Sequence, residues 1–432
     1  MNLRENLTVN NSNLYINSSN TVELAKKYGT PLYVMDEDRI ISNCLTFKNA
    51  MDKYFNGKCL VLFASKAFCN VYMHKLMASL GLGIDVVSGG ELYTAKTAGF
   101  DMNKVYFHGN NKTLSELKMA LELNVGRIVI DNVEEMGMLN SAAAQMNKTV
   151  KVMFRLKPGV EAHTHDFVKT GQLDSKFGFA IENGEAYNAI SHINDYKNLE
   201  YYGIHCHIGS QIFDPAPFEQ AAFVMLEFIK TLKNECALIT KELNLGGGYG
   251  IVYTDEDDPA SYELFCSNTF KAISNYCSKE NIEIPFVLIE PGRSIAGSAG
   301  ITLYTVGSVK RIKGVRNYVS IDGGMADNPR YILYGAKYDV IVANKANDDK
   351  NEIFTLVGKC CESGDIISEN IKLQTPAAGD IIAVLGTGAY NYSMSSNYNR
   401  IPKPAIVAVS GNSEKVIVKR ETYDDIIRND LL

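Results

Sequence analysis

Short apolar runs at a regular spacing dominate the pattern of hydrophobic and polar positions from residue 59 onward. They begin at residues 59, 83, 105, 127 and 151 and read CLVLFASKA, GIDVVS, VYFHG, RIVID and KVMFRLKP. Segments with helical spacing lie between them. In KTLSELKMALELN, at residues 112–124, Leu114, Leu117, Ala120 and Leu121 fall on one helix face. This regular alternation of a strand with a helix predicts successive β/α units.

Three further apolar runs extend the series over longer intervals. They begin at residues 201, 242 and 286 and read YYGIHCHIG, ELNLGGG and FVLIEPGR. Eight strands in successive β/α units predict a (β/α)8 TIM barrel, an α/β fold whose active face here carries long late loops. An open, doubly wound sheet is the alternative, because a sequence does not show whether the last strand pairs with the first.

The pattern changes after residue 293, where strand-like runs follow one another with few helical intervals. These runs are ITLYTVGSVKRI, NYVSIDGG, YDVIVAN, EIFTLVGKC, DIIAVLGTG, KPAIVAVSG and KVIVKRE. They predict a separate β domain. The segment TPLYVM near residue 35 predicts a strand that joins this domain, and DEDRIISNCLTFKNAMDKYF predicts a helix that leads into the barrel. The predicted division is 36–292 for the barrel, with 1–35 and 293–432 for the β domain.

Composition and charge narrow the class of protein. The 432 residues carry 43 Lys and Arg against 49 Asp and Glu, a net charge of -6 without a basic block, which argues against a nucleic-acid partner and for a small-molecule substrate. Nine cysteines without a CxxC pair predict neither a disulfide framework nor a metal site. The first residues lack the features of a signal peptide, and no run approaches about 18 apolar residues. We therefore expect a cytoplasmic protein without a membrane partner.

Polar residues end several of the apolar runs. In a (β/α)8 barrel the reactive groups lie at the C-terminal ends of the strands, so these residues should converge. The set comprises Lys66, Asp85, His108, Arg155, His207, the glycines 246–248, Glu290 and Arg293.

The three glycines and Lys66 together suggest a cofactor. The backbone N–H groups of residues 246–248 could bind a phosphate, although a tight βα turn would also explain them. A second glycine-rich loop, LGTGAYNYS, could add N–H groups and the hydroxyl of Tyr390. A lysine at an apolar strand end has a depressed pKa, so its neutral amine can form an imine with a carbonyl. Pyridoxal 5'-phosphate (PLP) offers both a phosphate and an aldehyde.

Three other residues fit a PLP site but have alternatives. Glu290 could face the pyridine nitrogen and keep it protonated, or could pair with Arg293. His207 could lie flat on the cofactor ring, or could be an ordinary core histidine. Asp85 could be only a helix cap or a turn residue.

A set of motifs in order resembles the diaminopimelate decarboxylase family of fold-type III PLP enzymes. The motifs cover residues from about 20 to 420 and read FASKAF, GIDVVSGGEL, FHGNNK, RLKPGVEAHTHDFVKTGQLDSKFGF, GIHCHIGSQIFD, LNLGGGYGI, EPGRSIAGSAG, DGGMADNPRYILYGA, GKCCESGD and GTGAYNYSMSSNYN. The resemblance implies a PLP-binding TIM barrel, a C-terminal β-barrel of sandwich-like form, and active sites shared in a head-to-tail homodimer.

The resemblance also implies roles for the cofactor-binding residues. Lys66 would be the Schiff-base lysine, His207 would stack on the ring, and Glu290 would pair with its nitrogen. Asp85 would lie near the Schiff base. The remaining cofactor contacts would come from Ser210, Gly247, Gly248, Pro291, Gly292, Arg293 and Tyr390.

Substrate contacts follow from the same resemblance. Arg293, Arg330, Tyr334 and Tyr390 would contact the substrate, since the planar fork of an arginine suits a carboxylate. Without the resemblance, packing of Arg330 and Tyr334 in a surface loop would explain them. Cys361 would donate a proton and Glu362 would bind the distal ammonium, both from the partner subunit. The family motif alone selects Cys361 over Cys360.

The implied activity is decarboxylation of meso-2,6-diaminopimelate at its D centre, which yields L-lysine in the last step of lysine biosynthesis. Decarboxylation of ornithine, arginine or carboxynorspermidine, or racemisation of an amino acid, are the alternatives within PLP chemistry. Glu290 argues against racemisation, because similar alanine racemases place an arginine at the ring nitrogen. A regulatory protein that has lost catalysis is an alternative of another class, although Lys66, Cys361 and the glycines are all retained.

Overall fold

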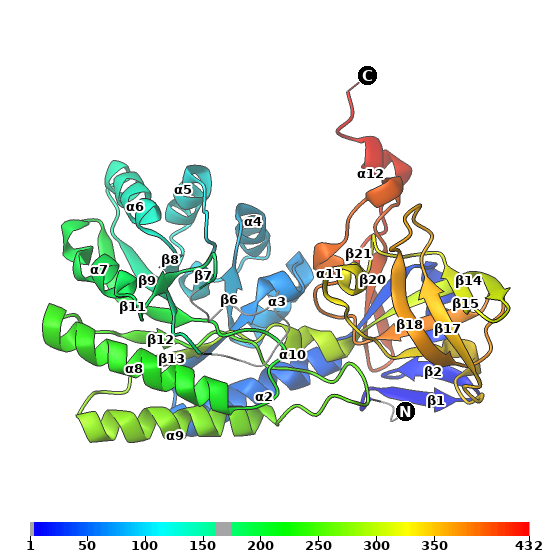
Figure 1. Ribbon diagram of the computed structural model, residues 1–432. Helices are drawn as coiled ribbons and strands as arrows, with labels where there is room; N and C mark the ends of the chain where they lie inside the picture. The colour runs from blue at the N-terminus through cyan, green and yellow to red at the C-terminus, as the bar shows by residue number, and fades with distance from the viewer. Residues whose placement is uncertain (1–3, 161–173, 432) are drawn as a thin grey trace. The chain divides into compact units, whose positions relative to one another are not determined.

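A computed structural model describes residues 4–160 and 174–431, drawn in Figure 1. The middle of the motif RLKPGVEAHTHDFVKTGQLDSKFGF, residues 161–173, lies outside this description. The chain forms two compact units. One comprises Met1–Ser42, Ile251–Asp258 and Ile295–Leu432, and the other comprises Asn43–Gly250 and Pro259–Ser294. Across the described ranges, no helix combines the length and apolarity that a membrane crossing requires.

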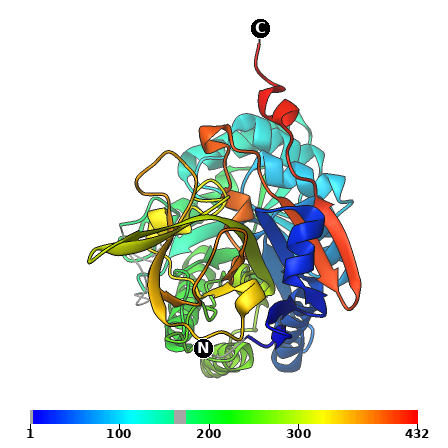
Figure 2. The same ribbon diagram turned by 90° about the vertical axis from the view of Figure 1, so that its right-hand side faces the viewer.

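The first unit is built on a sheet whose central strands are buried on both faces. Its strands are β4 (Leu32–Asp36), β14 (Gly300–Ile312), β15 (Arg316–Ile321), β16 (Val340–Val342), β17 (Glu352–Val357), β18 (Ile366–Leu373), β19 (Ile381–Leu385), β20 (Ala405–Ser410) and β21 (Ser413–Val418). The predicted strand TPLYVM is confirmed as β4, which pairs antiparallel with β14 and parallel with β20. Figure 2 shows this blue strand beside the red β20–β21 hairpin. The predicted β domain is confirmed.

Alternate residues of the central strands enter different cores. Ile341 and Ala383 pack in one cluster, whereas Val342 and Val384 pack in another. The first cluster is covered by α1 (Thr21–Tyr28) and by a small sheet of β1 (Leu7–Asn10), β2 (Asn13–Ile16) and β3 (Ser19–Asn20). Burial on both sides explains why these strands read as continuous apolar runs. Strand β18 was not predicted, because its sequence IISENIKL mixes polar and apolar residues.

The second unit is a closed barrel of eight parallel strands. They are β5 (Cys59–Ala64), β6 (Gly83–Val86), β7 (Val105–Phe107), β8 (Arg127–Ile130), β9 (Val150–Lys157), β11 (Leu199–Cys206), β12 (Glu242–Asn244) and β13 (Phe286–Ile289). The last strand pairs with the first, and β8 pairs with β9, so the ring is complete. The predicted TIM barrel is confirmed and the open sheet is excluded. A short extra strand, β10 (Phe179–Ala180), extends from β9 and was not predicted.

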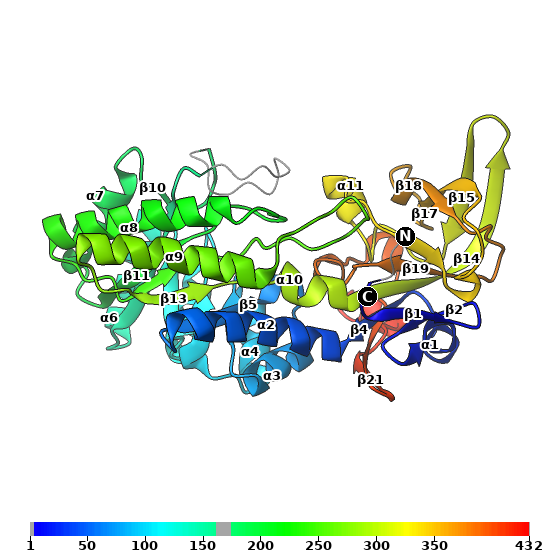
Figure 3. The ribbon, with the colours of Figure 1, turned by 90° about the horizontal axis from the view of Figure 1, so that it is seen from below.

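Helices surround the barrel strands. They are α3 (Val71–Ser79), α4 (Gly89–Thr97), α5 (Leu114–Glu122), α6 (Val133–Gln145), α7 (Glu185–Ser191), α8 (Ala216–Cys236) and α9 (Tyr262–Glu280), and Figure 3 shows α8 and α9 side by side. The predicted helix before the barrel is α2 (Glu37–Phe55). In α5, Leu117, Ala120 and Leu121 are buried as expected. Leu114 is exposed instead, because it begins the helix next to the capping residue Thr113.

Side chains fill the interior of the barrel in layers. Leu62, Tyr106, Val129, Met153 and Leu288, from five different strands, form one apolar layer. Towards the N-terminal ends of the strands, the Arg127 guanidinium donates to Glu242 at 2.9 and 2.6 Å, and Tyr106 donates its hydroxyl to the same carboxylate. The barrel is therefore a packed core closed at this end by a buried ion pair.

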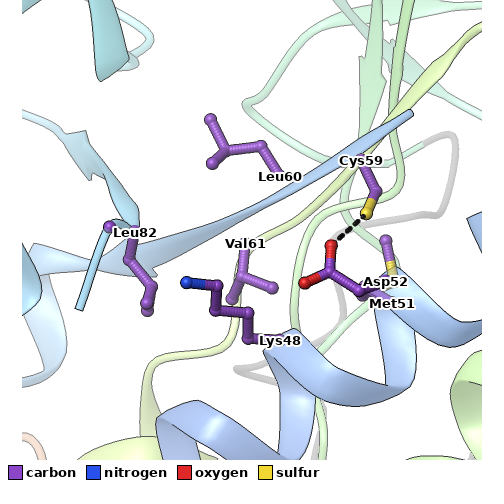
Figure 4. A pocket seen from close by; sticks show the side chains of 8 residues that line it. Lys48, Met51, Asp52, Cys59, Leu60, Val61 and Leu82 are labelled. Atoms are coloured by element: carbon purple, nitrogen blue, oxygen red, sulfur yellow. Dashed lines mark hydrogen bonds between the residues drawn. The ribbon is translucent and has the colours of Figure 1, made fainter. Parts of the chain in front are cut away.

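A small pocket lies beside the N-terminal ends of β5 and β6 (Figure 4). Asp52 on α2 and Cys59 on β5 face each other there, and the Cys59 thiol donates to the Asp52 carboxylate at 3.6 Å. Burial, then the neighbouring Asp52 charge, raises the pKa of Cys59 to about 12, so the thiol stays protonated. Catalytic groups of TIM barrels lie at the other ends of the strands, so this pocket is not the candidate site.

The buried ion pair gives a test of what stabilises the barrel. Glu242→Ala leaves the Arg127 guanidinium without its carboxylate inside the barrel. We expect the free energy of unfolding to fall by about 3 kcal/mol, because an unpaired charge held away from water is strongly destabilising. The thermal unfolding midpoint of each variant measures this loss of stability. Glu200→Ala is the matched control, since its pair with Lys241 at 2.9 Å is exposed and should contribute little. Equal midpoints for Glu242→Ala and the wild type would contradict the stabilising role.

Candidate active site

The candidate site begins two residues beyond the apolar layer of the barrel. Because side chains alternate along a strand, the residue two positions after an inward-facing one also faces inward. Tyr106, Val129, Met153 and Leu288 of the apolar layer therefore lead to a polar layer of His108, Asp131, Arg155 and Glu290. All four lie at the C-terminal ends of their strands, where catalytic groups of TIM barrels are found.

Lys66 lies at the same end of the barrel. It occupies a 3-10 turn, Ser65–Ala67, directly after β5, and its side chain is half-buried. The amide of Ala64, before this turn, donates to the carbonyl of Pro291, after β13, at 3.2 Å. A Cβ on Gly292 would lie 2.8 Å from the Cβ of Ala64, so only glycine allows this approach. Pro291 and Gly292 thus hold the end of β13 against the Lys66 turn.

Glu290 is a buried carboxylate with several nitrogen neighbours. Its Oε1 accepts a hydrogen bond from Asn244 Nδ2 at 2.7 Å and lies 2.9 Å from His108 Nε2. Its Oε2 lies 3.2 Å from His205 Nε2. Burial alone would raise the pKa of Glu290, but the two histidines outweigh it and hold the pKa well below its usual range. The side chain is therefore an anion inside the barrel.

His207 follows β11, and its ring faces the glycine loop after β12. Its Nδ1 accepts the N–H of Gly247 at 3.3 Å. Burial, then the charges of Lys66 and Arg155, hold the pKa of His207 well below its usual range. The ring is therefore neutral, and the Lys66 charge is one of the causes.

Asp85 is the third residue of β6 and is fully buried. The following helix α4 is capped by Ser88, so Asp85 is not a helix cap. Burial, then the Glu290 charge, raises the pKa of Asp85 to about 6, while Lys66 and His108 oppose the rise. Its Oδ1 has no hydrogen-bond partner among the described residues. An unsatisfied buried oxygen beside Lys66 fits a group that belongs there but is not part of the chain.

The glycine loop is shaped by close backbone contacts. Gly246 and Gly248 have φ of +68° and +118°, and a Cβ on Gly247 would lie 2.0 Å from the carbonyl oxygen of Glu290. Glycine is therefore required at all three positions. Two of the N–H groups that were expected to bind a phosphate are used within the chain, because Gly246 donates to Asn244 Oδ1 at 2.9 Å and Gly247 donates to His207. These bonds shape the loop.

Ser210 and Arg293 meet beside this loop. The Arg293 guanidinium donates to Ser210 Oγ at 2.9 Å, and Arg293 is the first residue of α10 (Arg293–Ala296). Arg293 is 8% exposed. A buried guanidinium and a hydroxyl are suitable donors for a phosphate or a carboxylate.

The site residues fit PLP. Lys66 supplies an amine for the aldehyde, Glu290 an anion for the ring nitrogen, and Ser210 with Arg293 donors for an acidic group. The orphaned oxygen of Asp85 and the tightly packed glycines are consistent with a flat ligand bound among them.

A metal ion is the other kind of ligand to consider. His108, His205 and Glu290 each offer a ligand atom, and these atoms lie within 4.8 Å of one another. Two histidines and a carboxylate can bind a divalent ion. Here, however, His205 Nε2 is hydrogen-bonded to Glu290 Oε2, and His108 Nε2 lies 2.9 Å from Oε1 without being aligned for a hydrogen bond. Nitrogens from both histidines therefore surround the carboxylate itself.

Arg330 belongs to the other unit, at the start of α11 (Arg330–Tyr334). It is 6% exposed, which excludes surface packing. Its Nη1 donates to the hydroxyls of Tyr253 at 3.0 Å and Tyr338 at 2.9 Å. Within the described part of the chain it has no carboxylate partner, so the structure provides a buried cation without a counterion. Tyr334 ends the same helix and is half-buried.

The loop between β17 and β18 carries the two adjacent cysteines. Cys360 is buried, and burial, then the charge of Asp365, raises its pKa to about 12. Cys361 and Glu362 are exposed, and the amide of Cys361 donates to Asn399 Oδ1 at 2.7 Å. The Asp365 carboxylate accepts the amide of Cys360 at 2.7 Å and so anchors the loop. Burial therefore distinguishes the two thiols, which the sequence did not.

Tyr390 lies in the second glycine-rich loop, after β19. It is half-buried and has φ of +63°, a left-handed conformation that is uncommon outside glycine. Its loop, like those of Arg330 and Cys361, belongs to the first unit.

Sequence reasoning missed Asp131 of the polar layer, and also His205 and Asn244, which are hydrogen-bonded to Glu290. The period of two in GIHCHIG places residues 205 and 207 on one face, so the signal for His205 was present. Register confirms its place, because His205 pairs with Asn244 on β12 and with Arg155 on β9. Asp131, two residues after Val129, accepts the amide of Gly178 at 3.0 Å.

Comparison with known proteins shows the family to which this sequence is similar. The family described as pyridoxal-dependent decarboxylase, pyridoxal binding domain, matches residues 37–297. The diaminopimelate decarboxylase of Bacillus subtilis (strain 168) is 47% identical over 418 residues, which is 97% of this chain and 95% of that protein. The diaminopimelate decarboxylase of Bacillus methanolicus is 47% identical over 408 residues, 94% of each chain.

A solved structure agrees with these relatives. The diaminopimelate decarboxylase of M. jannaschii, in complex with L-lysine, has a TM-score of 0.93 and 34% identity, and the match covers 99% of this chain and 98% of that one. The chain belongs to the pyridoxal-dependent decarboxylases, and within them to the diaminopimelate decarboxylase family.

Proposed function

We propose that this chain is a PLP-dependent carboxy-lyase that converts meso-2,6-diaminopimelate to L-lysine and carbon dioxide, the last step of lysine biosynthesis. The observation that carries the proposal is the ionised, buried Glu290 at the same barrel end as Lys66. An anion there favours a protonated ring nitrogen, which decarboxylation needs. The near-full-length similarity to diaminopimelate decarboxylases supports the choice of substrate.

Each of the barrel residues would have a different role toward the cofactor. Bound PLP supplies a conjugated ring that accepts the electron pair of a breaking bond at the substrate Cα. Lys66 would hold the cofactor through its aldehyde carbon and yield it to the substrate amine. Glu290 would hold the proton of the ring nitrogen, and the neutral ring of His207 would lie against the cofactor. Ser210, Arg293 and the glycine loop would bind its phosphate.

Arg330 is suited to the distal end of the substrate. It is a buried guanidinium, held by Tyr253 and Tyr338 through one nitrogen, with no carboxylate of its own in the described ranges. A substrate carboxylate would supply the missing negative charge in two parallel hydrogen bonds. Arg293, Tyr334 and Tyr390 would complete substrate recognition. Diaminopimelate has this distal carboxylate, whereas ornithine and arginine lack one.

We further propose that a second copy of the chain completes the site. Cys361 and Glu362 are exposed in the single chain, as groups that serve a partner's substrate would be. As the Cα–carboxylate bond breaks, carbon dioxide leaves without the bonding electrons. The Cys361 thiol would then give its proton to Cα, and water would reprotonate the thiolate. Glu362 would bind the distal ammonium.

Substrate choice is tested by turnover with added PLP. We expect meso-diaminopimelate to be decarboxylated at least about a hundredfold faster than ornithine or arginine, because a site built for a distal carboxylate is left with unpaired groups by substrates without one. Released carbon dioxide measures each rate. Faster turnover of ornithine would reject the assignment, and a chain that neither binds PLP nor releases carbon dioxide would instead support a regulatory role.

The proton donor is tested by two neighbouring substitutions. Cys361→Ser should lower turnover by about a hundredfold or more, the usual contribution of a positioned general acid, while PLP stays bound. Cys360→Ser is the matched control, because that thiol is buried and should not reach substrate. Full activity of Cys361→Ser would reassign the donor.

The shared site is tested by mixing two inactive proteins. Lys66→Ala and Cys361→Ala subunits should each be inactive alone, yet hybrid dimers would contain one site with both residues intact. We expect the mixture to regain part of the wild-type turnover. If subunit exchange is shown by mass spectrometry and no turnover returns, both residues act within one chain.

A further inference from the structure

The carboxylate of Glu290 is surrounded by side chains from three other strands of the barrel. Asn244 ends β12, His205 lies near the end of β11, and His108 follows β7. Parallel pairing sets His205 directly beside Asn244. All four side chains are at least nine-tenths buried, so their polar atoms depend on one another rather than on water.

The orientation of Asn244 is fixed from both ends of its amide. Its Oδ1 accepts the N–H of Gly246 at 2.9 Å, so that atom is the oxygen. Its Nδ2 then donates to Glu290 Oε1 at 2.7 Å. Asn244 therefore links the glycine loop to the carboxylate.

The tautomer of His205 also follows from the hydrogen-bond partners of its two ring nitrogens. Its Nδ1 is buried and has no hydrogen-bond partner in the part of the chain that the structure describes. A proton on Nδ1 would be an unsatisfied buried donor, so the proton lies on Nε2, which faces Glu290 Oε2 at 3.2 Å. Burial lowers the pKa of His205 to about 4, which agrees with a neutral ring that donates.

A count of the acceptor sites on the Glu290 carboxylate shows which of them is still open to a donor. A carboxylate has about four lone-pair sites, two on each oxygen. Asn244 occupies one site of Oε1, and His205 occupies one site of Oε2. His108 Nε2 lies 2.9 Å from Oε1, so it crowds the second site of that oxygen although it is not aligned for a hydrogen bond. One acceptor site, on Oε2, is left.

We propose that His205 and Asn244, together with His108, are positioning residues that hold Glu290 as an anion with a single acceptor site left for the ring nitrogen of PLP. This inference rests on the proposed function. None of the three residues needs to touch the cofactor ring nitrogen, since each acts through Glu290.

The test compares PLP with an analogue in which a C–H group replaces the ring nitrogen. Full-length protein is stripped of cofactor, and the dissociation constant of each compound is measured by the change in visible absorbance on binding. In His205→Phe, which keeps a flat ring but no donor, we expect the preference for PLP over the analogue to fall about tenfold, as for loss of a hydrogen bond to a charged group. Affinity for the analogue should not change.

Two further variants complete the comparison. His205→Gln keeps an N–H donor and should regain part of the preference. His192→Phe is the matched control, because His192 is an exposed histidine of the same unit and should keep the wild-type preference. If His205→Phe does not fold, Asn244→Leu replaces it, with the same expected fall in the ratio.

Equal losses for both compounds would mean a merely structural role and would overturn the inference, as would an unchanged ratio. A wild-type chain that binds neither compound would instead contradict the proposed function, so the two failures are distinguishable.

Discussion

Closure of the barrel is the constraint on which the site depends. The last strand, β13, pairs in parallel with the first, β5, so residues that lie more than two hundred positions apart along the chain become neighbours. The turn after β5 carries Lys66, and the first residue after β13 is Glu290. The bond from the Ala64 amide to the Pro291 carbonyl and the close contact at Gly292 fix the two ends together. An amine and a carboxylate can therefore face one ligand without either residing on a mobile arm.

The cost of placing charges inside the barrel explains much of the surrounding sequence. Buried ions are tolerated only when they are paired or hydrogen-bonded. At the N-terminal ends, Arg127 and Glu242 neutralise each other. At the C-terminal ends the buried acidic groups are not fully paired. Asp85 has an oxygen without a hydrogen-bond partner among the described residues and a pKa near 6, while Glu290 is held ionised. The same asymmetry recurs in the first unit, where Arg330 has two tyrosine hydroxyls but no carboxylate among the described residues. Such unbalanced groups are expected where a charged ligand binds.

Much of the fold could be predicted from the sequence, because the first five barrel strands repeat at a regular interval and all eight read as apolar runs. Closure of the barrel could not be predicted, since it depends on a pairing between strands far apart in the sequence. Strand β18 was not predicted, because its polar residues interrupt the apolar pattern of a strand. Within the site, Lys66 and Glu290 were evident as charged residues at the ends of apolar runs. His205 and Asn244 were missed, although the period of two indicated the first. Cys360 and Arg330 are buried, whereas Cys361 is exposed. This difference depends on tertiary packing, so no local sequence pattern predicts it.

Barrel closure places Lys66 where we propose that it carries the cofactor. Reduction of the PLP-loaded protein with borohydride converts an imine to a stable amine, and peptide mass spectrometry then locates the modified lysine. We predict that the added mass lies on the peptide that contains Lys66, and that it is lost in Lys66→Ala. Modification of a different lysine, or none at all in protein that turns over substrate, would contradict the claim.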